Sequence, residues 1–140
     1  MKILVINGHP DKESFCQEIF RTIVENIDSN HHELESINLN EIDFDPVLRY
    51  GYRKRMEEDS FILRSQELIQ WADHFIFVYP IWWSSMPSLL KGWIDRVFTP
   101  GIAYSANNQG SFIWNYLRGQ QFKKLLKGKT ASIYATSMAP

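Results

Sequence analysis

The chain has 140 residues, of which 44% are hydrophobic and 14% aromatic, and a formal net charge of −1. This length and composition predict one domain with a packed core, spanning residues 1–140. The near-neutral charge gives no electrostatic reason to expect nucleic acid or an anionic membrane as a partner. No stretch approaches the roughly 20 apolar residues needed to span a bilayer. A single cysteine, Cys16, excludes an internal disulfide and fits the reducing cytoplasm, where we expect the protein.

Four segments have the pattern of β-strands. Two are continuous apolar runs, typical of parallel strands covered on both faces, and one alternates apolar with polar residues, typical of an edge strand. The predicted strands are residues 3–6, 33–39, 75–79 and about 130–136. Three helices are predicted between the strands. The first runs from Ser14 to about Asp28, the second ends near Ala72, and the third runs from Pro87 to about Phe98. Ser14 and Ser85 are the candidate N-caps, and the stretch from Thr99 shows no clear register.

This alternation predicts an α/β fold with a doubly wound parallel sheet. The chain has no Gly-x-Gly-x-x-Gly fingerprint. Its first two strands favour the order 2-1-3-4 over that of a dinucleotide-binding domain. The carboxyl ends of the first and third strands then meet at one edge of the sheet, where open α/β sheets bind ligands.

Two motifs lie at this edge. After the strand at 75–79 comes the segment 79–98, whose loop carries the adjacent Trp82 and Trp83 and whose helix reads Leu-Lys-Gly-Trp-Ile-Asp-Arg-Val-Phe. After the first strand comes Gly8-His9-Pro10-Asp11-Lys12-Glu13-Ser14-Phe15. A helix that begins after Ser14 offers free N–H groups for an anion such as a phosphate. The two motifs together predict a planar, phosphate-bearing ligand.

Both motifs resemble those of the flavodoxin-like NAD(P)H:quinone oxidoreductases, the family of DT-diaphorase and its bacterial relatives. The resemblance continues with Gly101-Ile102-Ala103-Tyr104 and covers nearly the whole chain. It implies a flavin-dependent enzyme in which hydride passes from NAD(P)H through flavin N5 to a quinone or similar flat acceptor. The cofactor is expected to be FMN or FAD, with the dimeric members of the family favouring FAD.

The resemblance also implies the site residues. Trp83 is expected to pack on the isoalloxazine, Trp82 to face the partner subunit or the core, and Tyr104 to border the substrate pocket; Trp93 is expected in the core. The full set of residues implied to bind the cofactor is His9, Ser14, Phe15, Cys16, Pro80, Ile81, Trp82, Trp83, Ser84, Thr136 and Ser137. Cys16 stands where the family usually has Asn. His31, His32 and His74 lack ligand spacing, so no metal is expected.

A homodimer is expected, because the stretch 99–122 is rich in apolar residues and carries one charged residue, Arg118. In the family each flavin sits at such a subunit interface.

The chain ends where the family has its third flavin loop, so the domain is expected to be C-terminally incomplete, lacking the usual fifth strand. Residues 138–140 read Met-Ala-Pro where the family has small, flexible residues. A shortened flavodoxin-fold module with weak or no flavin binding, serving interaction or regulation, is therefore the alternative. Some family members act as ancillary subunits of potassium-efflux transporters. An electron-carrier flavodoxin is a third interpretation, and it is disfavoured by His9-Pro10 in the phosphate loop.

Overall fold

The computed structural model describes residues 1–106 and 122–137. The elements are β1 (Lys2–Asn7), α1 (Phe15–Asn26), β2 (Glu33–Asn38), the 3-10 helix η1 (Leu39–Glu41), α2 (Ser60–Trp71), β3 (His74–Pro80), α3 (Ser88–Val97), β4 (Tyr104–Ala106), β5 (Phe122–Lys124) and β6 (Thr130–Thr136). The strands and helices predicted from the sequence are all present, with boundaries shifted by a residue or two. No helix within the described ranges is long and apolar enough to cross a membrane.

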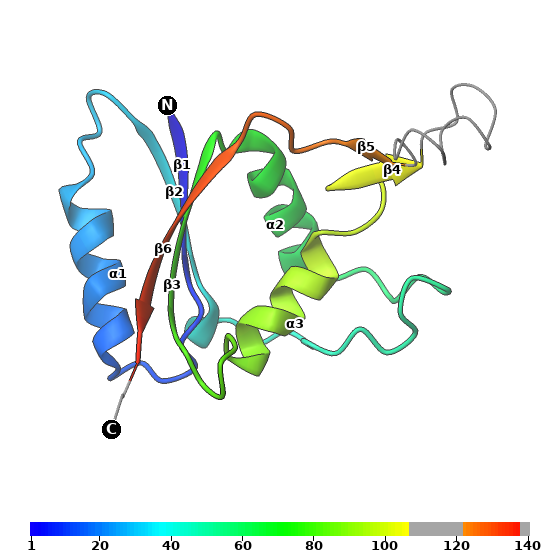
Figure 1. Ribbon diagram of the computed structural model, residues 1–140, viewed down its shortest axis with the longest axis horizontal. Coiled ribbons are helices and arrows are strands. Elements are labelled where there is room, and N and C mark those ends of the chain that lie inside the picture. The colour runs from blue at the N-terminus through cyan, green and yellow to red at the C-terminus, as the bar shows by residue number, and fades with distance from the viewer. Residues whose placement is uncertain (107–121, 138–140) are drawn as a thin grey trace.

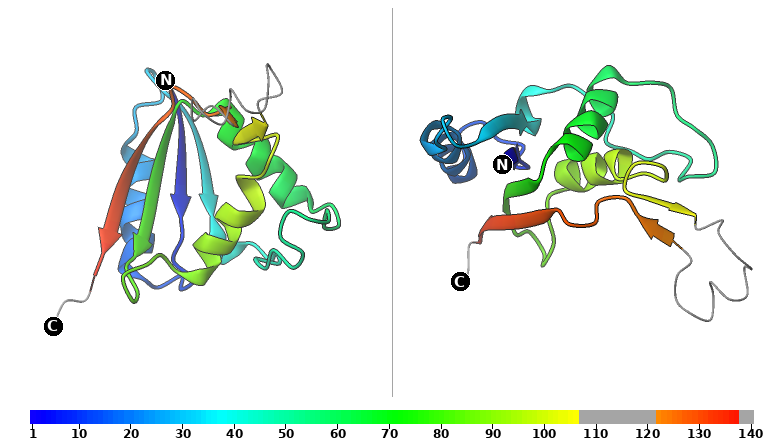
Figure 2. Two further views of the ribbon diagram at one scale, coloured as in Figure 1. Left: turned by 45° about the vertical axis from the view of Figure 1, so that its right-hand side comes forward. Right: turned by 90° about the horizontal axis from the view of Figure 1, so that it is seen from above.

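Four strands form one parallel sheet in the order β2-β1-β3-β6 (Figures 1 and 2). The central pair is β1 and β3, in a register that sets Leu4 opposite Phe75 and Ile6 opposite Phe77. With β6 as its fourth strand, this sheet confirms the predicted order 2-1-3-4. The chain leaves β1 toward β2 and returns to β3 on the other side of β1. This reversal is the switch point where the loops diverge and a crevice can form.

Helices cover both faces of the sheet. Helix α1 lies on one face, and α2 and α3 lie on the other (Figures 1 and 2). Alternate residues of β1 therefore enter two separate cores: Val5 packs with Phe20 under α1, and Leu4 packs with Trp93 under α3. Because both faces are buried, every residue of this strand core must be apolar, which explains the uninterrupted apolar run.

Trp93 belongs to the core between the sheet and α3, as predicted. Its side chain is completely buried, and its ring lies edge-on to Phe98 with the ring centroids 5.9 Å apart. The indole N–H donates to Ser65 Oγ at 3.1 Å, and Ser65 is itself fully buried. This hydrogen bond satisfies the only polar atom of the indole inside an apolar core.

Two helices have side-chain caps at their amino ends. Ser14 Oγ accepts the N–H of Gln17 at 3.2 Å, as predicted, and Asp59 accepts from the N–H groups of Phe61 and Ile62. The prediction that Ser85 caps α3 is wrong. Pro87 is the N-cap of α3 and has no side-chain cap bond, and Ser85 lies two residues earlier, in a tight turn with Trp82.

The prediction that the stretch between Thr99 and the last strand has no clear register is also wrong. Strand β4 pairs antiparallel with β5, with Tyr104 opposite Lys124. Three residues are too few to show a periodicity, so the sequence carries no signal for either strand. Most of the apolar stretch 99–122 that motivated the predicted dimer lies outside the described residues.

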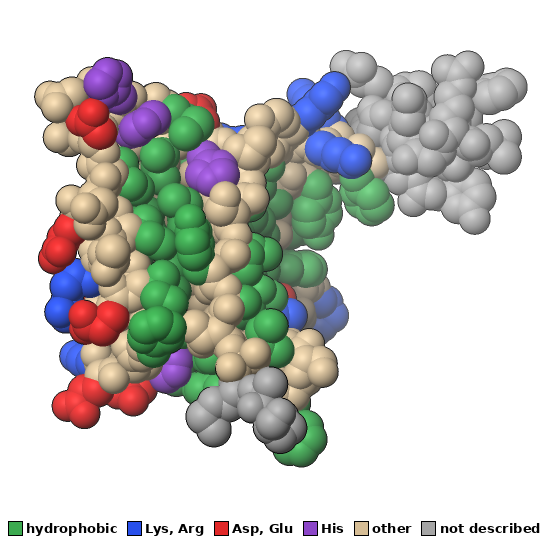
Figure 3. Space-filling view, turned by 60° about the vertical axis from the view of Figure 1, so that its left-hand side comes forward, with side chains coloured by type: hydrophobic (Ala, Val, Ile, Leu, Met, Phe, Trp, Pro, Cys, Tyr) green, Lys and Arg blue, Asp and Glu red, His purple; other side chains and the backbone are tan. Residues whose placement is uncertain are grey.

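Strand β6 is the exposed edge of the sheet. Its Ile133 and Tyr134 are 60% and 49% exposed, and as neighbours in a strand they point to opposite faces. In Figure 3 a band of apolar side chains runs between the polar outer surface of α1 and this strand. Within the described residues, no strand of this sheet lies beyond β6.

Candidate functional site

A cavity of about 750 Å³ opens at the carboxyl edge of the sheet, where the loops after β1, β3 and β6 meet. The structure brings together there all the residues predicted to bind a cofactor except Ser84, and adds Asp11. The lining residues are His9, Asp11, Ser14, Phe15, Cys16, Pro80, Ile81, Trp82, Trp83, Thr136 and Ser137. The volume falls within the range of small-molecule sites, which is about 300–1,000 Å³.

The loop after β1 passes so close to α3 that it needs a glycine. A Cβ on Gly8 would lie 2.7 Å from Cδ2 of Leu90 and 2.8 Å from Cβ of Leu90. The Gly8 N–H donates to the carbonyl of Val78 at 2.8 Å, which ties the loop to β3. The close contact therefore holds the first loop beside the second, where one ligand can touch both.

His9 is oriented by its own loop. Its Nδ1 accepts the N–H of Asp11 at 2.9 Å, so a neutral imidazole carries its proton on Nε2. The ring also lies edge-on to Trp82, with centroids 5.3 Å apart and planes at 76°. Nε2–H is therefore a fixed hydrogen-bond donor in a residue that lines the cavity.

The first turn of α1 supplies the anion-binding part of the cavity. Ser14 Oγ accepts the Gln17 N–H, which leaves its own hydroxyl hydrogen free to donate. The N–H groups of Phe15 and Cys16 belong to the first helical turn, where no helical carbonyl precedes them. Several donors thus converge on the end of the helix that carries a positive partial charge.

The loop after β3 is a tight turn with an unusual backbone. Trp82 and Ser85 exchange two N–H to carbonyl hydrogen bonds of 2.9 and 3.0 Å. Between them Trp83 and Ser84 both have positive φ, 51° and 59°, a region that non-glycine residues enter at an energetic cost. Such outliers concentrate at ligand sites, and here the surrounding hydrogen bonds hold the turn in place. Ser84 does not line the cavity; it forms the tip of this turn.

The two adjacent tryptophans differ in position. Trp82 lies against His9 and is half-exposed, which excludes it from the core. Trp83 borders the cavity with a fully exposed side chain, 101% on the relative scale. A large apolar ring so exposed is free to cover a ligand or a second protein surface.

The third wall of the cavity comes from the end of β6. The Ile81 N–H donates to the Thr136 carbonyl at 2.7 Å, which joins the second loop to this strand. Thr136 Oγ1 lies 3.2 Å from Sγ of Cys16, the buried cysteine at the start of α1. Ser137 completes this wall as the last residue that the structure describes.

Tyr104 does not reach this cavity within one chain. It begins β4, and its ring packs edge-on against Phe122 with centroids 5.6 Å apart. It also lies close enough to Tyr52 to act on it: burial raises the pKa of Tyr52, and Tyr104 and Asp95 raise it further. Within one chain, Tyr104 therefore lies apart from the residues that line the first cavity.

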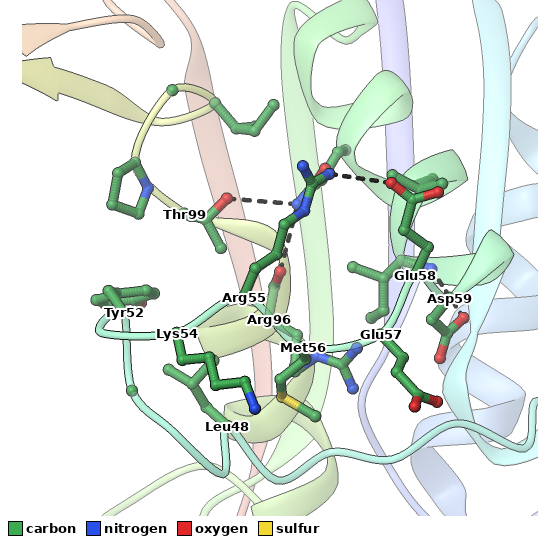
Figure 4. Close-up of a pocket in the computed structure, with 17 residues that line it drawn as sticks. Leu48, Tyr52, Lys54, Arg55, Met56, Glu57, Glu58, Asp59, Arg96 and Thr99 are labelled. Atoms are coloured by element: carbon green, nitrogen blue, oxygen red, sulfur yellow. Dashed lines mark hydrogen bonds and ion pairs between the residues drawn. The ribbon is translucent and has the colours of Figure 1, made fainter.

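A second cavity, of about 480 Å³, lies between the loop 48–59, α2 and the end of α3 (Figure 4). Several of its charged side chains have partners within the chain. Arg55 pairs with Glu58 at 3.3 Å, Arg96 donates to the Asp45 carbonyl at 2.5 Å, and Lys54 Nζ lies 4.9 Å from the Tyr50 ring centroid. None of the residues predicted to bind a cofactor line this second cavity. The described residues include no group of three or more metal-ligating side chains.

The sequence did not point to four amide residues beside the first loop, namely Asn7, Gln17, Asn38 and Asn40. They form a hydrogen-bonded cluster under His9. The available signal was weak: Asn7 directly follows the first apolar strand core, and Asn38 lies near the end of the second predicted strand.

A parallel sheet in this order, with a phosphate-type loop and an aromatic loop at its switch point, defines a flavodoxin-like protein. The chain belongs to the family of proteins described by a flavodoxin-like fold, whose model matches residues 1–140. The resemblance inferred from the segment 79–98 is thereby confirmed. Membership in a fold family does not by itself define an activity, which depends on the residues of the site.

Comparisons with single proteins agree with this family assignment. The mouse ribosyldihydronicotinamide dehydrogenase [quinone] is 28% identical over 154 residues, which cover 95% of this chain and 66% of the mouse protein. The crystal structure of Smu.1420 from Streptococcus mutans UA159 is 35% identical with a TM-score of 0.76, covering 100% of this chain and 70% of that one. An FMN-dependent NADH-azoreductase from Bacillus anthracis, solved with FMN, shares the fold at 19% identity and a TM-score of 0.68, covering 97% of this chain and 68% of that one. The chain spans less than two thirds of the mouse protein's length.

Proposed function

We propose that this chain binds a flavin in the cavity at the sheet edge and serves NAD(P)H-dependent reduction of a quinone or similar flat acceptor. The observation that supports this most is the cavity itself. It joins an anion-binding helix end to an aromatic loop, and a flavin nucleotide has both a phosphate and a planar ring. The quinone-dehydrogenase name of the mouse relative supports the reaction class.

The residues present fit the phosphate part of a flavin. The Ser14 hydroxyl, the His9 Nε2–H and the N–H groups that begin α1 are all donors, and a phosphate offers only acceptors. Asp11 also lines the cavity, but its Oδ1 accepts the Glu13 N–H at 3.0 Å. This hydrogen bond engages the carboxylate within its own loop.

The aromatic loop fits the ring part. The hydrogen bonds of its turn use the N–H groups of Trp82 and Ser85, and do not use those of Trp83 and Ser84. The latter two N–H groups are our candidates to stabilise negative charge that develops on the ring during reduction. We assign the stacking contact to Trp83, whose ring is free to adopt it.

A bound flavin would supply the hydride-transfer chemistry between NAD(P)H and the acceptor, with its phosphate held by Ser14, His9 and the first turn of α1. The chain binds the phosphate through Ser14 and α1, orients the ring with the turn at 82–85, and excludes water with Trp82 and Trp83. No side-chain nucleophile is required for this reaction.

We also propose a homodimer. Phe15 and Trp83, both beside the cavity, are 71% and 101% exposed, and such apolar side chains are commonly covered by a partner. Tyr104 lies away from the cavity of its own chain, so a partner subunit is the route by which it would reach a substrate. Two chains would then complete each site.

One observation favours the alternative, a module with weak or no flavin binding. Strand β6 carries the third wall of the cavity, yet most of its residues are exposed. A wall on an uncovered edge strand has little packing to hold it in place. The alternative therefore predicts a folded protein without a competent flavin site.

Titration decides between the two. Folded protein, verified by circular dichroism, is titrated with FMN and with FAD while the visible flavin bands and the flavin fluorescence are followed. NAD(P)H oxidation is then measured with a simple quinone. Saturable binding with turnover supports the proposal, and the tighter ligand identifies the cofactor. Folded protein that neither binds nor turns over would establish the alternative.

A further inference from the structure

The loop that begins the cavity rests on a cluster of four amide side chains, two of them buried and two partly buried. Asn7 ends β1, Asn38 ends β2, Asn40 lies in η1, and Gln17 lies in the first turns of α1. Asn7 is completely buried and Gln17 nearly so. The cluster therefore joins the carboxyl ends of two strands to the helix whose amino end faces the cavity.

Six hydrogen bonds connect these side chains and the loop. Asn7 Nδ2 donates to Gln17 Oε1 and to Asn38 Oδ1, both at 2.9 Å, and Asn38 Nδ2 donates to Gln17 Oε1 at 3.1 Å. Asn40 Nδ2 donates to Gln17 Oε1 at 3.0 Å and to the His9 carbonyl at 3.2 Å. Asn7 Oδ1 in turn accepts the His9 N–H at 3.1 Å.

The backbone of His9 fixes the orientation of every amide in the cluster. Its N–H needs an acceptor, so Asn7 must turn Oδ1 toward it and Nδ2 away. Its carbonyl needs a donor, so Asn40 must present Nδ2. These two Nδ2 groups then require Oε1 of Gln17 between them, and only one orientation of Asn38 completes the set.

The arrangement leaves one polar atom without a partner. Asn40 Oδ1 is buried and accepts no hydrogen bond from the described part of the chain. A buried amide oxygen without a donor lowers stability, so Asn40 is not the side chain that packing alone would favour here. The two hydrogen bonds that Asn40 donates, one of them to the His9 carbonyl, offset this cost.

We infer that Asn40 is a positioning residue: with Asn7 it clamps the backbone of His9 from both sides, and this presets the phosphate end of the cavity. His9 is held at its N–H, its carbonyl and its ring Nδ1. A loop fixed before the ligand arrives loses less conformational freedom on binding, which strengthens the complex. The inference rests on the proposed function for its ligand, and on the hydrogen bonds of the loop for its geometry.

Two alanine variants separate this role from ordinary stabilisation. Asn40→Ala removes the clamp on His9 and also the partnerless Oδ1, so the thermal unfolding midpoint should change little. Asn38→Ala is the matched control, because Asn38 bonds only within the cluster and does not touch the loop. If Asn40→Ala does not fold, Asn40→Leu keeps a branched side chain at this position and removes both donated bonds without adding a charge.

The first measurement needs no flavin. Hydrogen exchange of the His9 and Asp11 amides is followed by NMR in the apo protein. We expect exchange about tenfold faster in Asn40→Ala than in the wild type, with little change in Asn38→Ala. The second measurement is the flavin Kd by fluorescence quenching, which should rise about tenfold in Asn40→Ala alone.

Each outcome decides something. Equal exchange rates in the two variants would overturn the clamp. Faster exchange in Asn40→Ala with an unchanged flavin Kd would overturn the link to the ligand. Wild-type protein that binds no flavin while showing the expected exchange pattern would overturn the proposed function and leave the clamp established.

Discussion

The thiol of Cys16 lies 3.2 Å from the hydroxyl of Thr136, although the two residues are 120 positions apart in the chain. This contact joins the start of α1 to the end of β6, and with it the first and third walls of the cavity. Cys16 is 1% exposed, so water does not compete for the interaction.

The Cys16–Thr136 contact should appear as an energetic coupling. In a double-mutant cycle with Cys16→Ala and Thr136→Val, we expect a coupling of about 0.5–1 kcal/mol in the free energy of unfolding. Urea unfolding of the four proteins measures it. A cycle of Cys16→Ala with Thr130→Val, at the far end of β6, is the control and should give none. A coupling of zero in the first cycle would contradict the contact.

Trp83→Ala should weaken flavin binding with little effect on stability. The side chain is fully exposed, so its removal creates no cavity in the apo protein. Loss of one stacking contact, worth about 0.5–1.5 kcal/mol beyond area burial, raises the flavin Kd several-fold. Fluorescence titration and thermal unfolding measure the two effects. A large fall in the melting temperature at unchanged affinity would show that the ring is structural.

Trp93→Ala should do the reverse. Truncation of a buried Trp in a core costs about 3–5 kcal/mol of unfolding free energy. Ser65→Ala isolates the hydrogen-bond part, because it leaves the indole N–H buried without an acceptor at a cost of about 1–3 kcal/mol. Chemical denaturation measures both variants. Near-wild-type stability of Trp93→Ala would be incompatible with the packing seen here.

Gly92→Ala should destabilise the protein even though Ala favours helices. A Cβ at Gly92 would lie 2.4 Å from both the Cβ and the carbonyl oxygen of Pro46. The loop at Asp45 must then move, which disturbs the bond from Arg96 to the Asp45 carbonyl. We expect a net loss of about 1–3 kcal/mol, as in other overpacked sites. Ser88→Ala, at an exposed position of the same helix, is the control, and a stabilised Gly92→Ala would refute the close approach.

The proposed homodimer should be visible in solution. Light scattering on protein at micromolar concentration is expected to give twice the mass of the 16.5 kDa chain. A symmetric contact that resists dilution buries on the order of 1,200–2,000 Å² or more. A charged substitution such as Phe15→Glu at the exposed rim should shift the equilibrium toward monomer. A stable wild-type monomer would remove the second wall proposed for the site.

Much of the fold could be predicted because its signals are local. The apolar runs at residues 3–6 and 75–79 and the helical spacing after Ser14 each depend on a few consecutive residues. The predicted cap at Ser85 failed because the helix begins later than expected: Pro87 is the N-cap of α3, and Ser85 belongs to the preceding turn with Trp82. The pair β4 and β5 was missed because three-residue strands carry no period.

The sequence by itself determined the order of strands and helices, the apolar cores on both faces, and two motifs that must meet at the sheet edge. Only the tertiary structure decided that Cys16 meets Thr136, that Trp82 rather than Trp83 lies against His9, and that Asn40 reaches the His9 carbonyl. The physical reason is the separation along the sequence over which each effect acts. Backbone propensity and periodicity act over a few residues, whereas these contacts join segments 31 to 120 positions apart and exist only once the helices have packed on the sheet.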